Sequence, residues 1–152
     1  MILGIDPGTH CGWALVDDAG KICGCGTWDL SVARHEGGGM RFVRLRRYLE
    51  QVTSGVSLVA YEEVRRHAGV SAAHVYGGIV AVIQTICEAR DITYTGVPVG
   101  SWKKHLVGLG NAPKDTVRQH CVDSGYVQAG TAYDTCDALG IALYASRQWS
   151  TT

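Results

Sequence analysis

The first thirty residues alternate short apolar runs with turn-forming segments. Residues 1–5 are apolar and end at Asp-Pro-Gly, and residues 12–16 form a second apolar run that ends before the turn Asp-Asp-Ala-Gly. Residues 21–30 then alternate small and apolar side chains. Such runs between turns are typical of strands. The opening of the chain therefore predicts three strands in an antiparallel meander.

The remaining chain alternates strand patterns with helix patterns. A glycine-rich loop over 36–40 precedes apolar positions at helical spacing over 41–52, and buried strands are predicted over 56–61 and 92–97. Further helices are predicted over 72–90, 102–107, 113–123 and 133–149. No linker or repeat interrupts this order, so we predict a single domain over residues 1–152. Its fold class is α/β, with a mixed five-stranded sheet, antiparallel in its first three strands and parallel afterwards, and helices on both faces.

Composition narrows the class of protein without identifying it. The chain has 152 residues, of which 46% are hydrophobic, as in a soluble globular domain. No run reaches the ~18 consecutive apolar residues that a membrane helix needs, and the first ten residues lack the features of a signal peptide. The six cysteines form no Cys-x-x-Cys pair. We therefore expect no zinc site and no membrane contact, and a cytoplasmic protein with reduced thiols.

The charges cancel overall but are unevenly distributed. There are 14 basic and 14 acidic residues, and the basic ones gather over 41–47, 65–67 and 103–105. Such clusters are either solvated faces or contacts to nucleic acid. If four acids bind metal ions, removing them from 14 leaves 10 acidic residues. The remaining surface is then mildly basic.

Two carboxylates directly follow predicted strands. Asp6 stands between the first strand and a Pro-Gly turn, and Glu62 follows the strand over 56–61. Because side chains alternate between the two faces of a strand, Glu62 and Glu63 point in opposite directions. If the two strands are neighbours, Asp6 and Glu62 converge. The alternative is that Asp6 forms the turn and both acids meet solvent at strand ends.

A second pair of carboxylates begins the last predicted helix. Asp134 and Asp137 are three residues apart, so they share one helix face. Taken alone, this pair favours helix capping, since acids in the first turn interact well with the helix dipole. Taken with Asp6 and Glu62, it suits two Mg²⁺ ions, which prefer carboxylate oxygens and activate water for attack on a phosphodiester. We expect Mn²⁺ to substitute.

Four segments, in order, resemble the motifs of the RuvC family of Holliday-junction resolvases, which have the RNase H-like fold. Residues 2–9 resemble the first-strand motif, and residues 60–64 resemble the second acidic motif, with its glutamate at Glu62. Residues 102–114 resemble the basic loop and following helix, and residues 134–139 resemble the final paired-acid motif. The resemblance spans nearly the whole chain and implies one RNase H-like nuclease domain.

The resemblance also implies a substrate and a mechanism. It implies a homodimer that resolves Holliday junctions, and other branched DNA, by hydrolysis that leaves a 5′-phosphate and a 3′-hydroxyl. The catalytic residues would be Lys114 together with the four carboxylates, Asp6, Glu62, Asp134 and Asp137, which would also bind the metal ions. The DNA-binding residues would be Arg65, Arg66, Lys103, Lys104 and Lys114.

One position departs from the family's pattern. Cellular members carry an aromatic residue after the glutamate motif, whereas this chain has Arg65 followed by Arg66. Arginine contacts phosphate or stacks on a base, so it forms a different wedge at the junction. In this respect the chain resembles the divergent members encoded by bacteriophages, which implies a bacterial or phage-infected host cell. Base preference at the cut and partnership with a branch-migration motor are left open.

Three other functions remain alternatives. The first is a nuclease of the same fold that acts on an RNA–DNA hybrid or a flap, because the acids perform the same chemistry on each. An ATP-binding module shares the Asp-x-Gly-Thr opening, but that class needs two such domains. A binding-only relative would lack the acids.

The helix over 72–90 is the expected dimer contact, because it carries the small residues Ala73, Gly77, Gly78 and Ala81. The alternative is that this helix packs only on its own sheet.

Overall fold

Five strands form one mixed sheet. The structure, a computed structural model, describes residues 1–149. The strand order across the sheet is β3-β2-β1-β4-β5. Strands β1, β2 and β3 form the antiparallel meander, in which β2 pairs with both β1 and β3. Strand β4 is parallel to both of its neighbours, β1 and β5. The strands are β1 (Ile2–Asp6), β2 (His10–Val16), β3 (Ile22–Asp29), β4 (Leu58–Glu63) and β5 (Thr93–Pro98). This topology confirms the mixed sheet predicted from the sequence.

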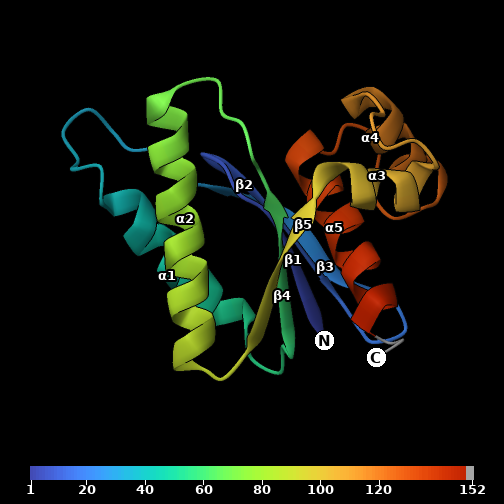
Figure 1. The fold of residues 1–152 in the computed structure, drawn as a ribbon, viewed down its shortest axis with the longest axis horizontal. Coiled ribbons are helices and arrows are strands. Elements are labelled where there is room, and N and C mark those ends of the chain that lie inside the picture. Colours follow the sequence, from blue (N-terminus) through green and yellow to red (C-terminus); the bar gives the residue numbers. More distant parts are fainter. Residues whose placement is uncertain (150–152) are drawn as a thin grey trace.

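Helices cover both faces of this sheet, as predicted (Figure 1). One face carries α1 (Met40–Val52) and α2 (Val70–Ala89). The other carries α5 (Tyr133–Trp149), against which α3 (Val99–Val107) and α4 (Lys114–Asp123) pack. The carboxyl ends of β1 and β4 and the start of α5 therefore lie at the same end of the molecule.

Side-chain alternation divides the core into two layers. Leu3 and Ile5 of β1 pack toward α1 and α2, whereas Ile2 packs toward α5, and all three are fully buried. Full burial of each aliphatic side chain contributes about 1.5–3 kcal/mol. Gly4 lies under α5, where a Cβ would be 2.6 Å from the backbone nitrogen of Ala142. The glycine therefore lets α5 lie directly on β1.

Element boundaries differ from the predictions where apolar periodicity gives little signal. The helix predicted over 102–107 begins at Val99, because Pro98 has a φ of −63° and ends β5 as the N-cap of α3. The helix predicted from residue 72 begins at Val70. The strand predicted from residue 12 begins at His10, which pairs with Asp29 in the β2–β3 ladder. Backbone pairing, which extends beyond the apolar residues, determines that strand end.

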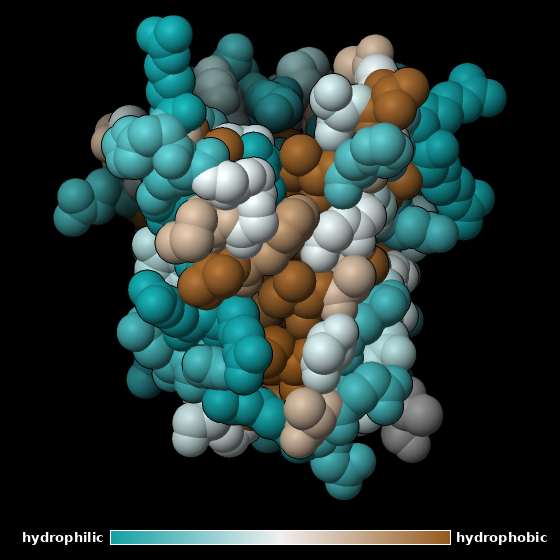
Figure 2. All heavy atoms as spheres, turned by 90° about the vertical axis from the view of Figure 1, so that its left-hand side faces the viewer, coloured by the Kyte–Doolittle hydropathy of each residue, from teal (hydrophilic) through white to brown (hydrophobic). Residues whose placement is uncertain are grey.

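Helix α2 is unusually apolar for the amount of it that is buried. By length and composition alone it could cross a membrane, a property that a search for uninterrupted apolar runs misses. Only Ile79, Ile83, Ile86 and Cys87 are buried, against the sheet. Figure 2 looks onto the face covered by α1 and α2, where apolar side chains run down the middle between hydrophilic flanks.

Candidate active site

The carboxyl ends of β1 and β4 place two carboxylates beside each other. Ile5 stands opposite Tyr61 in the parallel register, so Asp6 and Glu62 are the next residues on the two strands. Both point to the face covered by α5, because they alternate with Ile5 and Tyr61, which pack toward α1 and α2. The structure therefore brings Asp6 and Glu62 together, as the alternation pattern predicts.

The start of α5 brings the other two carboxylates over the same edge. Asp134 and Asp137 lie in its first turns, and Gly12 of β2 allows the close approach, since a Cβ there would overlap the Asp134 carbonyl. Thr27 of β3 and Thr135 share a hydroxyl hydrogen bond of 2.8 Å. These contacts hold the start of the helix against the sheet.

Asp137 does not have the environment of a helix cap. Asp137 is only 6% exposed, and its Oδ1 has no hydrogen-bond partner among residues 1–149. Leaving a buried polar atom unpaired costs roughly 1–3 kcal/mol, and more when it is charged. An oxygen of this kind suits a cation as its partner, which is the observation that favours a metal site over capping.

The carboxylates interact electrostatically. Burial raises the pKa of Asp6 well above its usual value, and the charges of Glu62, Asp137 and Asp134 raise it further, in that order. Lys114 opposes the shift. Several ionised acids so close together are destabilised unless cations compensate them.

The pKa values of Asp137 and Glu62 are also raised by burial and lowered by nearby lysines. Burial, followed by the charge of Glu62, raises the pKa of Asp137 to about 6. Burial also raises the pKa of Glu62, against the lowering effects of a hydrogen bond from Trp102 and of the nearby Lys103 and Lys114. Two lysines thus act on the same carboxylates that act on each other.

The carboxylates are near one another but not already gathered around one point. Among residues 1–149, no three Asp, Glu, His or Cys side chains are close enough to enclose a metal ion. Repulsion between ionised acids favours such separation, and the indole Nε1 of Trp102 holds Oε2 of Glu62 at 2.9 Å. Four hard oxygen donors and the unpaired Oδ1 of Asp137 fit divalent cations, which would draw the acids together.

The three predicted lysines occupy different environments. Lys103 is half-buried, and its Nζ donates a hydrogen bond of 2.9 Å to the Ala112 carbonyl. Lys114 is exposed at the first position of α4 and is held near α5 because its neighbour Asp115 accepts a hydrogen bond from Tyr133. Lys104 is exposed in the last turn of α3 and is not among the groups that shift the carboxylate pKa values. The structure thus places Lys103 and Lys114, but not Lys104, in the electrostatic surroundings of the acids.

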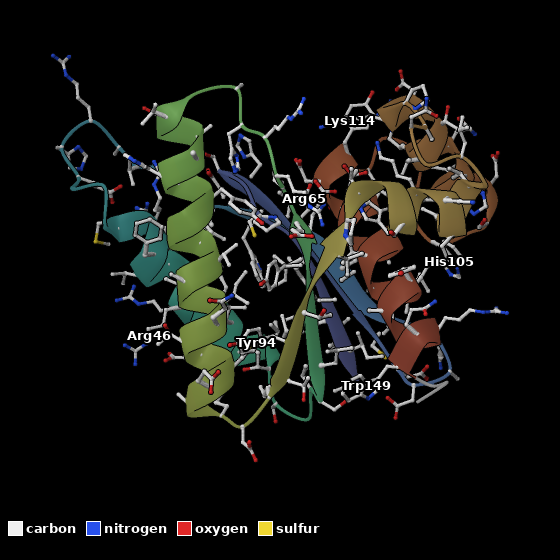
Figure 3. All side chains as sticks on the ribbon, viewed as in Figure 1. Arg46, Arg65, Tyr94, His105, Lys114 and Trp149 are labelled. Carbon is white, nitrogen blue, oxygen red and sulfur yellow. The ribbon has the colours of Figure 1, made fainter. Side chains whose placement is uncertain are left out.

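The two predicted arginines lie beyond the end of β4 and are exposed. The guanidinium of Arg65 forms an ion pair of 3.3 Å with Glu63. Arg65, Arg66 and Glu63 border a hollow of about 460 Å³ that also reaches Glu62. Figure 3 shows Arg65 and Lys114 at the same end of the sheet. Positive charge therefore flanks the carboxylates.

Tyr76 was not singled out from the sequence, and Arg41 and His67 were noted there only as members of basic clusters. Tyr76 of α2 donates a hydrogen bond of 3.0 Å to the Glu62 carbonyl and accepts one of 3.1 Å from the Val64 amide, which fixes the backbone after β4. Arg41 and His67 line a second hollow, of about 400 Å³, beside the turn that follows Asp6. No spacing in the sequence indicates these contacts, because each joins segments far apart in the chain.

The family model of the crossover junction endodeoxyribonuclease RuvC matches residues 2–145. Two relatives with that name come from Nitratidesulfovibrio vulgaris. The protein of strain Hildenborough is 30% identical over 147 residues, covering 93% of this chain and 87% of the relative. The protein of strain DP4 is 29% identical over 150 residues, with the same coverage.

Solved structures show the same fold. RuvC of T. thermophilus in complex with a Holliday junction substrate has a TM-score of 0.83 and 23% identity, covering 99% of this chain and 94% of that one. The yeast mitochondrial Holliday junction resolvase Ydc2 has a TM-score of 0.65 and 13% identity, covering 99% and 78%. The expected RNase H-like fold is thereby confirmed.

Proposed function

This chain belongs to the RuvC family of crossover junction endodeoxyribonucleases, and we propose that it resolves Holliday junctions at the site formed by Asp6, Glu62, Asp134 and Asp137. The observation that carries the proposal is the buried Oδ1 of Asp137, which has no hydrogen-bond partner among residues 1–149 and lies near three other carboxylates at the end of the sheet. A metal site in a nuclease accounts for all four buried or half-buried acids, whereas helix capping concerns only the two at the start of α5.

The four carboxylates fit two Mg²⁺ ions, and Mn²⁺ has the same preference for oxygen donors. When bound, such ions activate a water for attack on phosphorus and stabilise the departing oxygen. Hydrolysis adds the water oxygen to phosphorus and breaks the bond to the 3′ oxygen, so the products are a 5′-phosphate and a 3′-hydroxyl. The four acids would hold the ions, and the sheet and α5 position the acids.

The lysines act on the phosphate. Lys114 carries an exposed positive charge at the edge of the carboxylates, where it stabilises negative charge that develops on the phosphate oxygens. Lys103 is more fixed, since it is tied to the Ala112 carbonyl. Lys104 points to solvent and contributes to backbone binding at longer range.

Arg65 and Arg66 contact the branch of the DNA. Both are exposed beyond the catalytic strand end, and the hollow beside them leads to Glu62. Guanidinium groups bind phosphates and stack on unpaired bases, which are both present where strands separate. This contact selects branched over continuous duplex DNA without requiring a particular base. The relatives identified are bacterial, and the likeness to phage-encoded members stays a prediction.

A second copy of the chain docks on α2. The outer side of this helix is uncharged and exposed along Val70, His74, Gly77, Ala81 and Thr85. No atom of the described part of the chain lies within 4 Å of a Cβ built on Gly77, so the helix surface is open there. Small residues at this spacing permit close helix packing, and a dimer on this face would cover apolar surface that Figure 2 shows there. A dimer also provides two sites for the two strands of a junction.

A protein that acts on chromosomal or phage DNA meets its substrate in the cytoplasm of a bacterial cell, so the proposed location is cytoplasmic.

A substrate panel tests this function against a nuclease of the same fold with another target. Equal concentrations of a four-way junction, a flap, an RNA–DNA hybrid and plain duplex are incubated with the protein and Mg²⁺. We expect the junction to be cut fastest and the plain duplex to stay intact. Faster cleavage of the hybrid or the flap would assign the site to the alternative substrate.

A further inference from the structure

Trp102 is a large, fully buried side chain whose polar atom reaches the catalytic acids. It comes from α3, and its indole Nε1 donates a hydrogen bond of 2.9 Å to Oε2 of Glu62 on β4. The two residues are 40 positions apart in the chain. A buried tryptophan usually finds a partner for this group, but the partner here is one of the proposed metal ligands.

The indole ring is fixed from the other side by α5. A Cβ on Gly140 would be 2.5 Å from Cε3 of Trp102, so only glycine leaves room for the ring. Gly140 stands three residues after Asp137 on the same helix. Trp102 therefore spans from the helix that carries Asp137 to the side chain of Glu62.

This contact uses one of the two oxygens of Glu62. The side chain of a glutamate has several rotamers, and an unligated acid near other acids tends to turn away from them. A donor on a rigid, packed ring holds the carboxylate in one orientation before any cation binds. The remaining oxygen, Oε1, accepts no hydrogen bond from the other side chains and amides of residues 1–149.

We propose that Trp102 is a positioning residue for the metal site, which holds Oε2 of Glu62 through its indole N–H and leaves Oε1 to bind a metal ion. The inference rests on the proposed function, since it requires Glu62 to be a metal ligand. It extends that function by assigning the orientation of this ligand to a residue that never touches substrate.

Two substitutions separate the hydrogen bond from the packing. Trp102→Phe removes the donor and part of the ring, whereas 3-benzothienylalanine at position 102 keeps a two-ring side chain and replaces N–H by sulfur. Trp13→Phe is the matched control, because Trp13 stacks on Trp28 on the opposite side of the sheet. Thermal unfolding establishes that each variant is folded.

The measurement is Mn²⁺ binding to the DNA-free protein, followed by the loss of the electron paramagnetic resonance signal of free Mn²⁺. Both substitutions at position 102 are expected to weaken binding about tenfold, the lower end of what loss of a residue that orients a ligand costs. Trp13→Phe is expected to bind like the parent. The Mg²⁺ concentration for half-maximal junction cleavage should rise in parallel, with a smaller change in the rate at saturating Mg²⁺.

Unchanged Mn²⁺ affinity with benzothienylalanine would overturn the inference, because it would show that the ring only fills space. Equal weakening by Trp13→Phe would overturn it as well. A parent protein that binds no Mn²⁺ would contradict the proposed function and the inference with it. If the parent binds Mn²⁺ and the variants at position 102 bind it equally well, only the inference fails.

Discussion

Gly12 of β2 lies directly against the backbone carbonyl of Asp134, so the sheet and the start of α5 meet without an intervening side chain. We expect Gly12→Ala to push the helix start away and to destabilise the fold by roughly 1–3 kcal/mol, as overpacking does. Displacing Asp134 should also abolish most cleavage. Urea unfolding and junction cleavage measure the two effects.

Gly24→Ala provides the control for Gly12→Ala. It lies on the neighbouring β3, where the nearest atom to an added Cβ is 3.4 Å away, in the ring of Trp13. We expect this variant to keep its stability and activity. If Gly12→Ala matched it in both measurements, the close approach at Asp134 would not be needed.

The acidity of Asp137 predicts how pH acts on the metal-free protein. Its pKa is raised from 3.8 to about 6, chiefly by burial. The unfolded chain therefore ionises first, and the folded state loses stability as pH rises from about 4 to about 6. Because the pKa of Asp6 is raised too, it contributes in the same direction.

Thermal unfolding in EDTA and in Mg²⁺ across this range tests that prediction. The midpoint in EDTA should fall as pH rises, and the gain from Mg²⁺ should be larger above pH 6 than below, because the ions bind ionised acids. Asp137→Asn should weaken both trends. A metal-free midpoint that rises steadily through this pH range would contradict the environment described for Asp137.

Lys114 and Lys104 are predicted to differ although both are exposed lysines. Lys114→Ala should lower the maximal cleavage rate roughly 100-fold, as loss of a group that stabilises developing charge does. Lys104→Ala should reduce junction affinity and its dependence on salt, with little change in the maximal rate. Single-turnover cleavage at saturating protein separates the two effects, and equal loss of rate would remove Lys114 from the chemistry.

The outer side of α2 predicts the oligomeric state. Ala81→Glu places a charge in the exposed small-residue strip and should convert the protein to monomers, because an unpaired charge is costly in a packed interface. Thr116→Glu on the exposed side of α4 should have no such effect. Sedimentation velocity measures both. A monomeric parent, or an Ala81→Glu dimer, would argue against this interface.

The strand pattern at residues 62 and 63 predicts a large part of the site. Alternation places Glu62 on the face of Asp6 and Glu63 on the other, and in the structure Glu63 lies beside Gly96 and pairs with the exposed Arg65. The period of two is a local property, so the sequence alone reveals it. The mixed sheet and the order of helices follow from similar local patterns.

The contacts between distant segments are not accessible in this way. Asp134 and Asp137 look like ordinary helix-start acids until Gly12 brings them over β1 and β4. Trp102 is visible in the sequence only as the first residue of a basic motif, and its bond to Glu62 depends on how α3 packs against α5. Such pairings are set by tertiary packing, which no spacing along the chain encodes.

Asp6→Asn tests the central claim most directly, since it removes one charge from the carboxylate cluster and keeps the size of the side chain. The measurement is cleavage-site mapping on a fixed and a mobile four-way junction with Mg²⁺, alongside junction binding. The parent should leave paired, symmetric nicks with 5′-phosphate ends, and Asp6→Asn should bind the junction without cutting it. Cleavage by Asp6→Asn at the parent rate would contradict the assignment of the four carboxylates as the active site.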